Sequence, residues 1–246
     1  MANFGSALAL ADHLITAEKG GLAAAGTALA NYSPTLSYGL DPASRGWGGA
    51  RNRADRMSDR LTLEQCEKLI QAARFAELIG LPFNRHWIVH NERAGISPEN
   101  GQAFVGRLLR LARSYVKRRG GQFAAIYCRE NGDGKGEHVH ILMHVSPALS
   151  LLNKTATWVR KAGGTYRAGV SRVATIGGSL KRLDPASEHY QANADMVLSY
   201  LLKGADELAA EALGLRKCAE YGWIMGKRCG ASENIGSTAR ARCGRH

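Results

Sequence analysis

Three histidines lie close together in the stretch GEHVHILMHV, residues 136–145. Because successive residues of a β-strand point to opposite faces, His138 and His140 leave the same face, roughly 6–7 Å apart at the backbone. Both imidazoles can therefore reach one divalent ion. His144 shares that face, but at about 3.3 Å per residue it lies about 13 Å from His140, which is too far for the same ion.

The third ligand of such an ion should come from the neighbouring strand. Glu130 ends the preceding predicted strand, directly before the turn, and its carboxylate is the best candidate. Glu137 is the nearer alternative, but as the neighbour of His138 it should point to the opposite face. Two imidazoles and a carboxylate form a mixed site that suits Mn²⁺, Mg²⁺ or another first-row ion.

A tyrosine and a lysine form a second candidate pair in the stretch LSYLLKG. Tyr200 and Lys203 are three residues apart, so they share a face if this stretch is helical. Tyr200 lies off the centre of the helix's apolar stripe; the alternative is a partly exposed tyrosine near a surface lysine. Tyr190 lies in a polar stretch interrupted by Pro185, which predicts a loop.

The elements that would position these residues follow from periodicity and from turn signals. The helix over 61–80 should begin at Thr62, with Gln65 completing a capping box, and end at Gly80. Further helices are predicted over 97–121, 148–164 and 194–213, and strands over 85–92, 122–130, 138–145 and 170–177. The turn residues NGDGKG predict a hairpin between the second and third strands. This order favours an α+β fold, a ferredoxin- or RRM-like antiparallel sheet with helices packed on one side.

The chain is strongly basic, with a net charge of +12 and a pI near 9.8. Residues 1–60 contribute only +1, and the segments between Glu99 and Glu130 and between Glu137 and Asp184 contain no acidic residue. Such stripes suit a polyanion, most often nucleic acid, and the alternative is a solvated basic surface. The candidate nucleic-acid-binding residues are Arg107, Arg110, Arg113, Lys117, Arg118, Arg119, Arg160, Lys161, Arg172, Lys181 and Arg182.

The remaining features concern location and domain organisation. No run approaches the ~18–20 apolar residues of a membrane span, and the N-terminus lacks the basic and apolar regions of a secretory signal. The five cysteines form no CxxC pair, which favours a reduced, cytoplasmic setting. We expect a loosely structured N-terminal extension over 1–60 with a short helix over 6–17, a main domain over 61–212, and a basic tail over 213–246.

Together these motifs resemble the HUH single-strand DNA endonucleases, and among them the rolling-circle replication initiators. HVHIL matches the histidine–hydrophobe–histidine motif and YLLK matches the Tyr-x-x-Lys motif. HWIVHNE is similar to the first-strand motif of these initiators, and CRENGDGKGEHVH to their glutamate-before-hairpin arrangement. The likeness covers about residues 84–204, with the motifs in the right order.

The resemblance implies a HUH nuclease domain over 61–212. His138, His140 and Glu130 would hold the ion, Tyr200 would attack the scissile phosphate to give a 5′-phosphotyrosyl intermediate, and Lys203 would steady the charge. The implied partner is single-stranded DNA or a DNA hairpin at a plasmid or phage origin, with host replication proteins as further partners. Some phage initiators have two motif tyrosines, whereas this motif has one. Relaxases usually place their tyrosine before three histidines, whereas here it follows the pair, and we expect no helicase domain.

Three other interpretations compete with this resemblance. GWIMGKR has three residues between its glycines and an arginine at the magnesium-binding position, so it is not a P-loop. GDGKGEHVH partly matches a cupin motif, but the following glutamate is missing and the chain is rich in predicted helices. The more serious alternative is a non-catalytic basic module that binds RNA or DNA on a ferredoxin-like sheet.

Overall fold

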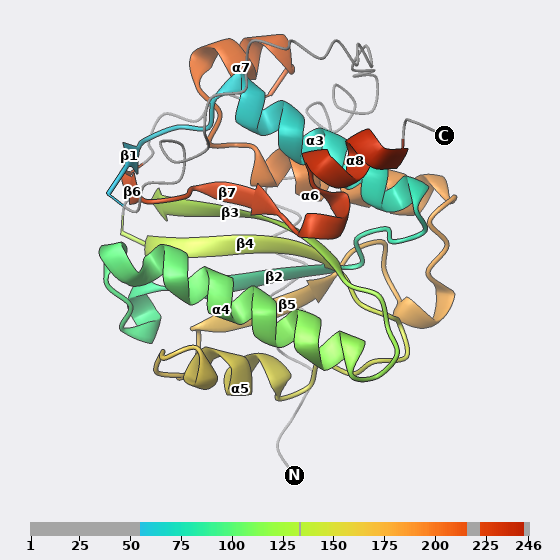
Figure 1. The fold of residues 1–246 in the computed structure, drawn as a ribbon, viewed down its shortest axis with the longest axis horizontal. Coiled ribbons are helices and arrows are strands. Elements are labelled where there is room, and N and C mark those ends of the chain that lie inside the picture. Colours follow the sequence, from blue (N-terminus) through green and yellow to red (C-terminus); the bar gives the residue numbers. More distant parts are fainter. Residues whose placement is uncertain (1–54, 133, 216–221, 244–246) are drawn as a thin grey trace.

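The computed structural model describes residues 55–132, 134–215 and 222–243, so the helix expected over 6–17 lies outside the described residues. A five-stranded antiparallel sheet with the order β5-β2-β4-β3-β7 runs through the molecule (Figure 1). Its strands are β2 (Arg85–His90), β3 (Ala124–Gly132), β4 (Gly136–His144), β5 (Ser171–Thr175) and β7 (Cys229–Ala231). Two short strands, β1 (Met57–Ser58) and β6 (Ile224–Met225), pair separately.

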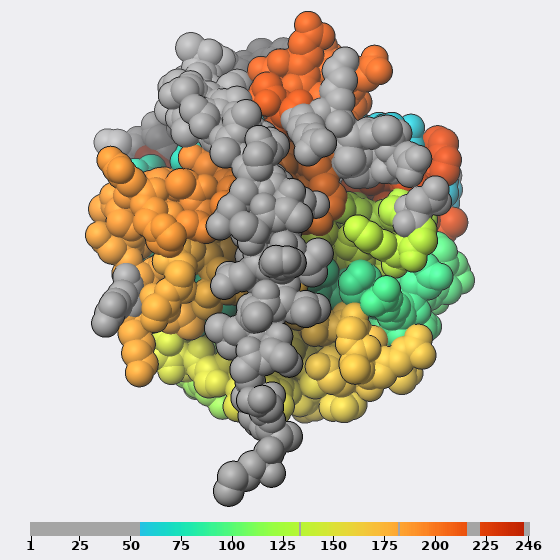
Figure 2. All heavy atoms as spheres, turned by 180° about the vertical axis from the view of Figure 1, so that it is seen from behind, coloured from blue at the N-terminus to red at the C-terminus, as the bar shows by residue number. Residues whose placement is uncertain are grey.

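Helices cover both faces of the sheet. They are α3 (Leu63–Leu78), α4 (Pro98–Lys117), α5 (Lys154–Lys161), α6 (Glu188–Leu201), α7 (Glu207–Ala212) and α8 (Ser237–Cys243), with short 3₁₀ turns η2 (Glu92–Ala94), η3 (Leu180–Arg182) and η4 (Glu233–Ile235). Figure 1 shows α3, α6, α7 and α8 on one side of the sheet and α4 and α5 on the other. Seen from behind, α7 again lies at the top and α5 at the bottom (Figure 2). The α+β class is confirmed, but the expectation of helices on one side is wrong. None of the described helices has the length and hydrophobicity needed to cross a membrane.

Two apolar cores explain why both faces are covered. One core joins the sheet to α3, α6 and α7 and includes Leu69, Leu142 and Leu198. The other joins it to α4 and α5 and includes Phe104 and Ile141. Because both faces of the sheet are covered, β4 is buried along almost its whole length, and its polar residues Glu137, His138 and His140 are buried as well.

Local signals set the ends of the first long helix as predicted. The Thr62 side chain accepts from the backbone N–H of Gln65, and the Gln65 side chain accepts from the backbone N–H of Thr62, which completes the capping box of α3. Gly80 follows the helix with a φ of 76°, a conformation that suits glycine. In α4, Pro98 occupies the first turn, where its missing N–H costs no helical hydrogen bond.

The single helix predicted over 194–213 is two helices. α6 ends at Leu201 with Leu202 as its C-cap, and beyond it the carbonyl oxygen of Gly204 accepts from the N–H of Leu61 at 2.8 Å. The Asp206 side chain then accepts from the N–H of Ala209 at 2.8 Å and starts α7. α6 also begins earlier than predicted, at Glu188.

The region expected to be a basic tail contributes to the sheet. β7 pairs with β3 and forms one edge of the five-stranded sheet, so the boundary predicted at residue 212 does not separate a folded domain from an appendage. A buried arginine holds this return segment in place. The Arg228 guanidinium donates to the backbone oxygens of Ser58 in β1 and of Gly222, which lies just before β6. It therefore links β1 to the residues that lead into β6. Residues 55–60, assigned to the N-terminal extension, likewise contribute β1.

Candidate active site

Glu130, His138 and His140 form a buried group that could hold a metal ion. In the β3–β4 hairpin Glu130 pairs directly with His138, and His140 lies two residues farther along the same face. Oε2 of Glu130 is 3.4 Å from Nε2 of His138 and 3.5 Å from Nε2 of His140. One candidate ligand atom from each residue lies within 4.8 Å of the others. The hairpin register therefore brings together the three ligands that the spacing predicted.

The hydrogen bonds of this triad fit a cation. Nδ1 of His138 donates to the carbonyl oxygen of Gly136 at 3.0 Å, which leaves a lone pair on Nε2 of the neutral ring. Among the described residues, Nε2 of His140 and Oε1 of Glu130 are buried without a hydrogen-bond partner. An unsatisfied buried polar atom costs about 1–3 kcal/mol. A divalent ion would satisfy both atoms, so the donor set suits a metal.

Two histidines of β2, His86 and His90, extend the site; both lie in the HWIVHNE stretch, but the sequence motifs assign neither of them a role. Nε2 of His86 lies 3.0 Å from Nδ1 of His140. The ring centre of His90 is 5.3 Å from that of His138, its directly paired residue. Their spacing of four residues in a predicted strand places both on one face, and that pattern could have identified them.

Burial keeps the imidazoles of His86, His90 and His140 neutral. Burial, with a further contribution from the adjacent His140, lowers the pKa of His86 to about 3. Burial also lowers the pKa of His90 to about 4, with His138 adding to the effect. The pKa of His140 is lowered as well, again mainly by burial. Neutral imidazole is the form that coordinates a metal ion.

The Glu130 carboxyl, in contrast, is kept ionised by its neighbours, against the effect of burial. Burial alone would raise its pKa, but His140, His138 and Lys203 together hold it well below the usual range. Lys203 is the complementary cation, since its Nζ lies 3.0 Å from Oε2 of Glu130. Burial alone would lower the pKa of Lys203, but Glu130 and Tyr200 raise it. The site therefore combines a buried carboxylate with a lysine that stays charged.

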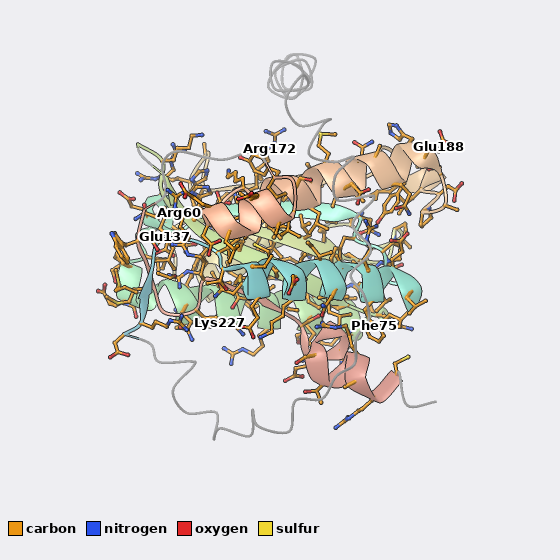
Figure 3. All side chains as sticks on the ribbon, turned by 90° about the horizontal axis from the view of Figure 1, so that it is seen from above. Arg60, Phe75, Glu137, Arg172, Glu188 and Lys227 are labelled. Atoms are coloured by element: carbon orange, nitrogen blue, oxygen red, sulfur yellow. The ribbon has the colours of Figure 1, made fainter. Side chains whose placement is uncertain are left out.

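Tyr200 lies over the triad from the last turn of α6. Its ring centre is 5.2 Å from that of His140, with the two planes at 85°. Nζ of Lys203 is 3.7 Å from the centre of the Tyr200 ring. Lys203 follows the C-cap Leu202, so it reaches the tyrosine from beyond the helix rather than from one helical face as predicted. Figure 3 shows α6 running from Glu188 toward the end of the molecule that carries Glu137.

The alternative nucleophile and the alternative ligand lie elsewhere. Tyr190 is helical rather than in a loop, because the Ser187 side chain accepts from its N–H and caps α6. Its hydroxyl is buried and donates to the carbonyl oxygen of Phe83 at 2.8 Å. Glu137 points to the other face of the sheet as expected, where it pairs with Arg129.

Most of the predicted nucleic-acid-binding residues lie across the sheet from the triad. Those on or next to α4 and α5 are Arg107, Arg110, Arg113, Lys117, Arg118, Arg119, Arg160 and Lys161. Arg107 donates to the carbonyl oxygen of Ala162 at 2.7 Å, and Arg113 pairs with Glu233 at 3.1 Å. Most of the others of this group are exposed. We call these eight residues the α4–α5 basic surface.

Arg172 is on the triad side. Arg172 on β5 lies opposite Ile88 on β2, and Ile88 lies opposite His140 on β4. Directly opposed residues share a face, so all three side chains leave the same face of the sheet. Lys181 and Arg182 belong to η3, between β5 and α6, and Lys181 is exposed. The structure thus divides the predicted phosphate contacts between two sides of the sheet.

The assembled site consists of the Glu130–His138–His140 triad, two further histidines, a tyrosine and a partly buried lysine on one sheet face. Compared with protein-family models, with curated proteins and with solved structures, this chain matches none of them.

Proposed function

We propose that this protein is a metal-dependent endonuclease of the HUH type, which nicks and rejoins single-stranded DNA through Tyr200. The observation that carries the proposal is the position of Tyr200, with its ring 5.2 Å from that of His140 in a buried metal-binding triad. A tyrosine beside a site for a divalent ion and a charged lysine is equipped for covalent phosphoryl transfer. The five-stranded antiparallel sheet is consistent with a ferredoxin-like fold, the fold that HUH nucleases have.

Glu130, His138 and His140 would hold the divalent ion, which when bound polarises the scissile phosphate. Two imidazole nitrogens favour a first-row ion such as Mn²⁺, and the carboxylate also accepts Mg²⁺. His86 contributes from outside this ligand set, because its hydrogen bond to Nδ1 of His140 fixes the orientation of that ring.

Tyr200 supplies the nucleophile in this proposal. Its hydroxyl oxygen forms a bond to the phosphorus, and the bond between the phosphorus and the 3′-oxygen breaks. The products are a 5′-phosphotyrosyl enzyme and a free 3′-hydroxyl, and the proton lost by the tyrosine appears on the 3′-oxygen. One phosphodiester replaces another, so the strand can be rejoined without ATP. Lys203 stabilises the negative charge that develops on the tyrosine oxygen.

The charge of the chain supports a nucleic-acid substrate. The net charge of +12 attracts phosphate backbones, and Arg172 places one positive charge on the triad face. Sequence-specific cleavage of one strand at a plasmid or phage origin would start rolling-circle replication. The rival function, a basic binding module without catalysis, accounts for the charge but gives no role to the triad with Tyr200 and Lys203.

Trapping the covalent intermediate tests this function. The wild-type protein is incubated with a pool of single-stranded oligonucleotides and Mn²⁺, and protein–DNA adducts are isolated and mapped by mass spectrometry. We expect a phosphotyrosyl peptide containing Tyr200, which Tyr200→Phe abolishes while DNA binding remains. Tyr166→Phe, a partly buried tyrosine of the α4–α5 side, is the matched control and should form the adduct normally. No adduct under any metal condition would favour the non-catalytic module.

A further inference from the structure

Trp223 is the exposed tryptophan of the described chain. Its exposed fraction is 58%, whereas Trp87 and Trp158 are 0% and 4% exposed and pack in the core beneath α4 and α5. An indole left in water forgoes the favourable free energy that its burial would provide. An exposed tryptophan that is also held rigidly is therefore a good candidate for contact with a ligand.

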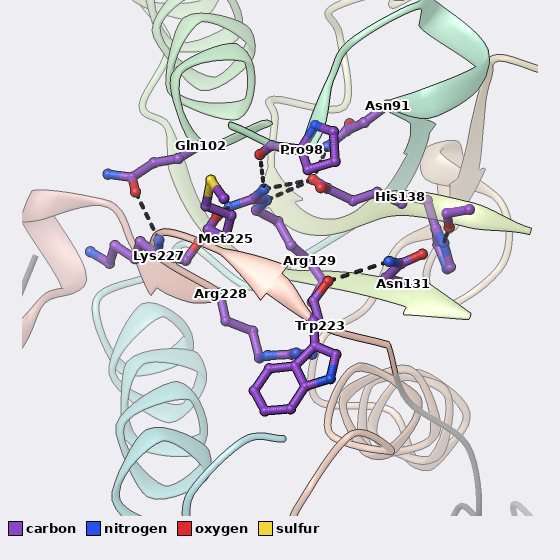
Figure 4. Close-up of polar contacts among 12 residues, drawn as sticks. Asn91, Pro98, Gln102, Arg129, Asn131, His138, Trp223, Met225, Lys227 and Arg228 are labelled. Atoms are coloured by element: carbon purple, nitrogen blue, oxygen red, sulfur yellow. Dashed lines mark hydrogen bonds and ion pairs between the residues drawn. The ribbon is translucent and has the colours of Figure 1, made fainter. Parts of the chain in front are cut away.

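The backbone beside Trp223 is fixed on two sides. The N–H of Gly222 donates to the carbonyl oxygen of Asn131 at 2.5 Å, and the Asn131 side-chain amide donates to the carbonyl oxygen of Trp223 at 3.3 Å. Arg228 donates to the carbonyl oxygen of Gly222 at 3.1 Å. A Cβ atom at position 222 would clash with the backbone oxygen of Asn131, so the approach requires glycine. Figure 4 shows the resulting contact between Asn131 and Trp223.

This anchor places Trp223 beside the triad. Asn131 directly follows Glu130 on β3, and the segment with Trp223 lies on the side of β3 away from β4. Two strand spacings of about 4.8 Å put its backbone about 10 Å from that of His138. In Figure 4 the indole points away from Pro98 and Gln102 of α4, toward the side of the sheet that carries the triad.

Positive charge gathers at the same end of the hairpin. A polar hollow of about 410 Å³ is lined by Asn131 and by the basic side chains of Arg93, Lys135 and Arg167, together with the carboxylate of Glu92. Asn131 thus borders this hollow and also holds Trp223. Proteins that bind single strands combine a positively charged groove for phosphates with aromatic rings on which bases stack. Both components meet at the end of β3.

We infer that Trp223 is a nucleobase-binding residue, on which a base of single-stranded DNA stacks next to the strand segment that enters the triad. The inference rests on the proposed function for the identity of the substrate. Stacking itself needs neither a metal ion nor Tyr200, so it can be measured separately. Because every base has an aromatic face, this contact would position the strand without reading its sequence.

Tryptophan fluorescence tests the inference in the absence of metal. A short oligothymidylate is titrated in EDTA into the wild type and into Trp223→Phe, and the difference between the two signals isolates Trp223. We expect quenching in that difference. We also expect Trp223→Ala to lower the affinity about tenfold, and Trp223→Phe to retain most of it. Leu152→Ala, which removes another strongly exposed apolar side chain, is the matched control and should bind as the wild type does.

A second measurement varies the oligonucleotide. One abasic position is moved along the oligonucleotide, and a single position should weaken binding to the wild type but not to Trp223→Ala. Absent quenching together with unchanged affinity of Trp223→Ala would overturn the inference, even if Tyr200 forms its covalent adduct. Quenching without any adduct would support the stacking contact while contradicting the nuclease.

Discussion

Nε2 of His86 lies 3.0 Å from Nδ1 of His140, so a side chain of β2 forms a hydrogen bond to the Glu130–His138–His140 triad. If His140 binds an ion through Nε2, its proton must be on Nδ1, and His86 is the acceptor of that proton. The lowered pKa of His86, caused first by burial and then by His140, keeps this acceptor neutral. The contact would therefore fix both the tautomer and the ring orientation of His140 as a metal ligand.

We predict that His86→Phe lowers the affinity for Mn²⁺ about tenfold, because His140 loses the partner that orients it. Titration followed by electron paramagnetic resonance of free Mn²⁺ measures the affinity. His144→Phe is the control, since His144 donates to the carbonyl oxygen of Pro82 and lies outside the triad. Unchanged affinity in His86→Phe would show that the hydrogen bond does not support the ligand.

His138→Ala or His140→Ala should abolish metal binding and cleavage, because each removes a ligand. Glu130→Ala should weaken both, and Glu211→Gln, an exposed carboxylate on α7, should change neither. Isothermal titration with Mn²⁺ and a nicking assay on the same preparations measure the two effects. If Glu130→Ala binds and cleaves normally, the third ligand lies elsewhere. Glu137 would then be a poor substitute, because it is paired with Arg129 on the other face.

The α4–α5 basic surface should bind DNA without affecting cleavage of a short substrate, because the sheet separates it from the triad. Replacing Arg110, Lys117, Arg160 and Lys161 together by serine should reduce the salt dependence of binding to long single strands. The slope of log K against log salt should fall by up to about 0.7 for each phosphate that the variant no longer neutralises. Nicking of an oligonucleotide just long enough to span the site should keep its rate. Arg172→Ser, on the triad face, should weaken binding of that short oligonucleotide instead.

The sequence predicted the triad well because its geometry is local. Strand alternation and one hairpin turn suffice to place Glu130 opposite His138, and both signals are short-range. The pairing of β7 with β3 could not be predicted in this way, since its residues Cys229–Ala231 show no alternation and their partner lies about a hundred residues earlier. The break between α6 and α7 could not be predicted because the apolar pattern continues across it, and the hydrogen bonds of Gly204 and Asp206 with Leu61 appear only in the folded chain.

Acidification should destabilise the metal-free protein. Burial lowers the pKa of His86 to about 3 and that of His90 to about 4, whereas an unfolded histidine titrates near 6.5. Below that value the unfolded state binds protons that the folded state does not, so stability is present above about pH 6.5 and is lost as the pH falls toward 4. Urea midpoints in EDTA at pH 7.5 and pH 5 measure the loss. His86→Phe should reduce the difference, and an unchanged pH dependence in that variant would contradict the assignment.

The buried ion pair of Arg129 and Glu137 holds the C-terminal return segment against β3. The Arg129 guanidinium donates to Oε1 of Glu137 at 2.7 and 2.9 Å and to the carbonyl oxygen of Met225 at 2.7 Å. Arg129→Met would leave a buried carboxylate without its cation, which costs about 3–5 kcal/mol. We expect a loss of that size in the free energy of unfolding measured with urea.

The exposed pair of Arg113 and Glu233 provides the matched comparison, since such pairs contribute only about 0–1 kcal/mol. Arg113→Met should therefore unfold at nearly the same urea concentration as the wild type. Adding Glu137→Gln to Arg129→Met should recover part of the stability, because the unpaired charge is removed. Equal losses in Arg129→Met and Arg113→Met would mean that the buried pair does not hold the return segment. A large loss in Arg129→Met alone would explain how β7, a strand of three residues, keeps its place at the edge of the sheet.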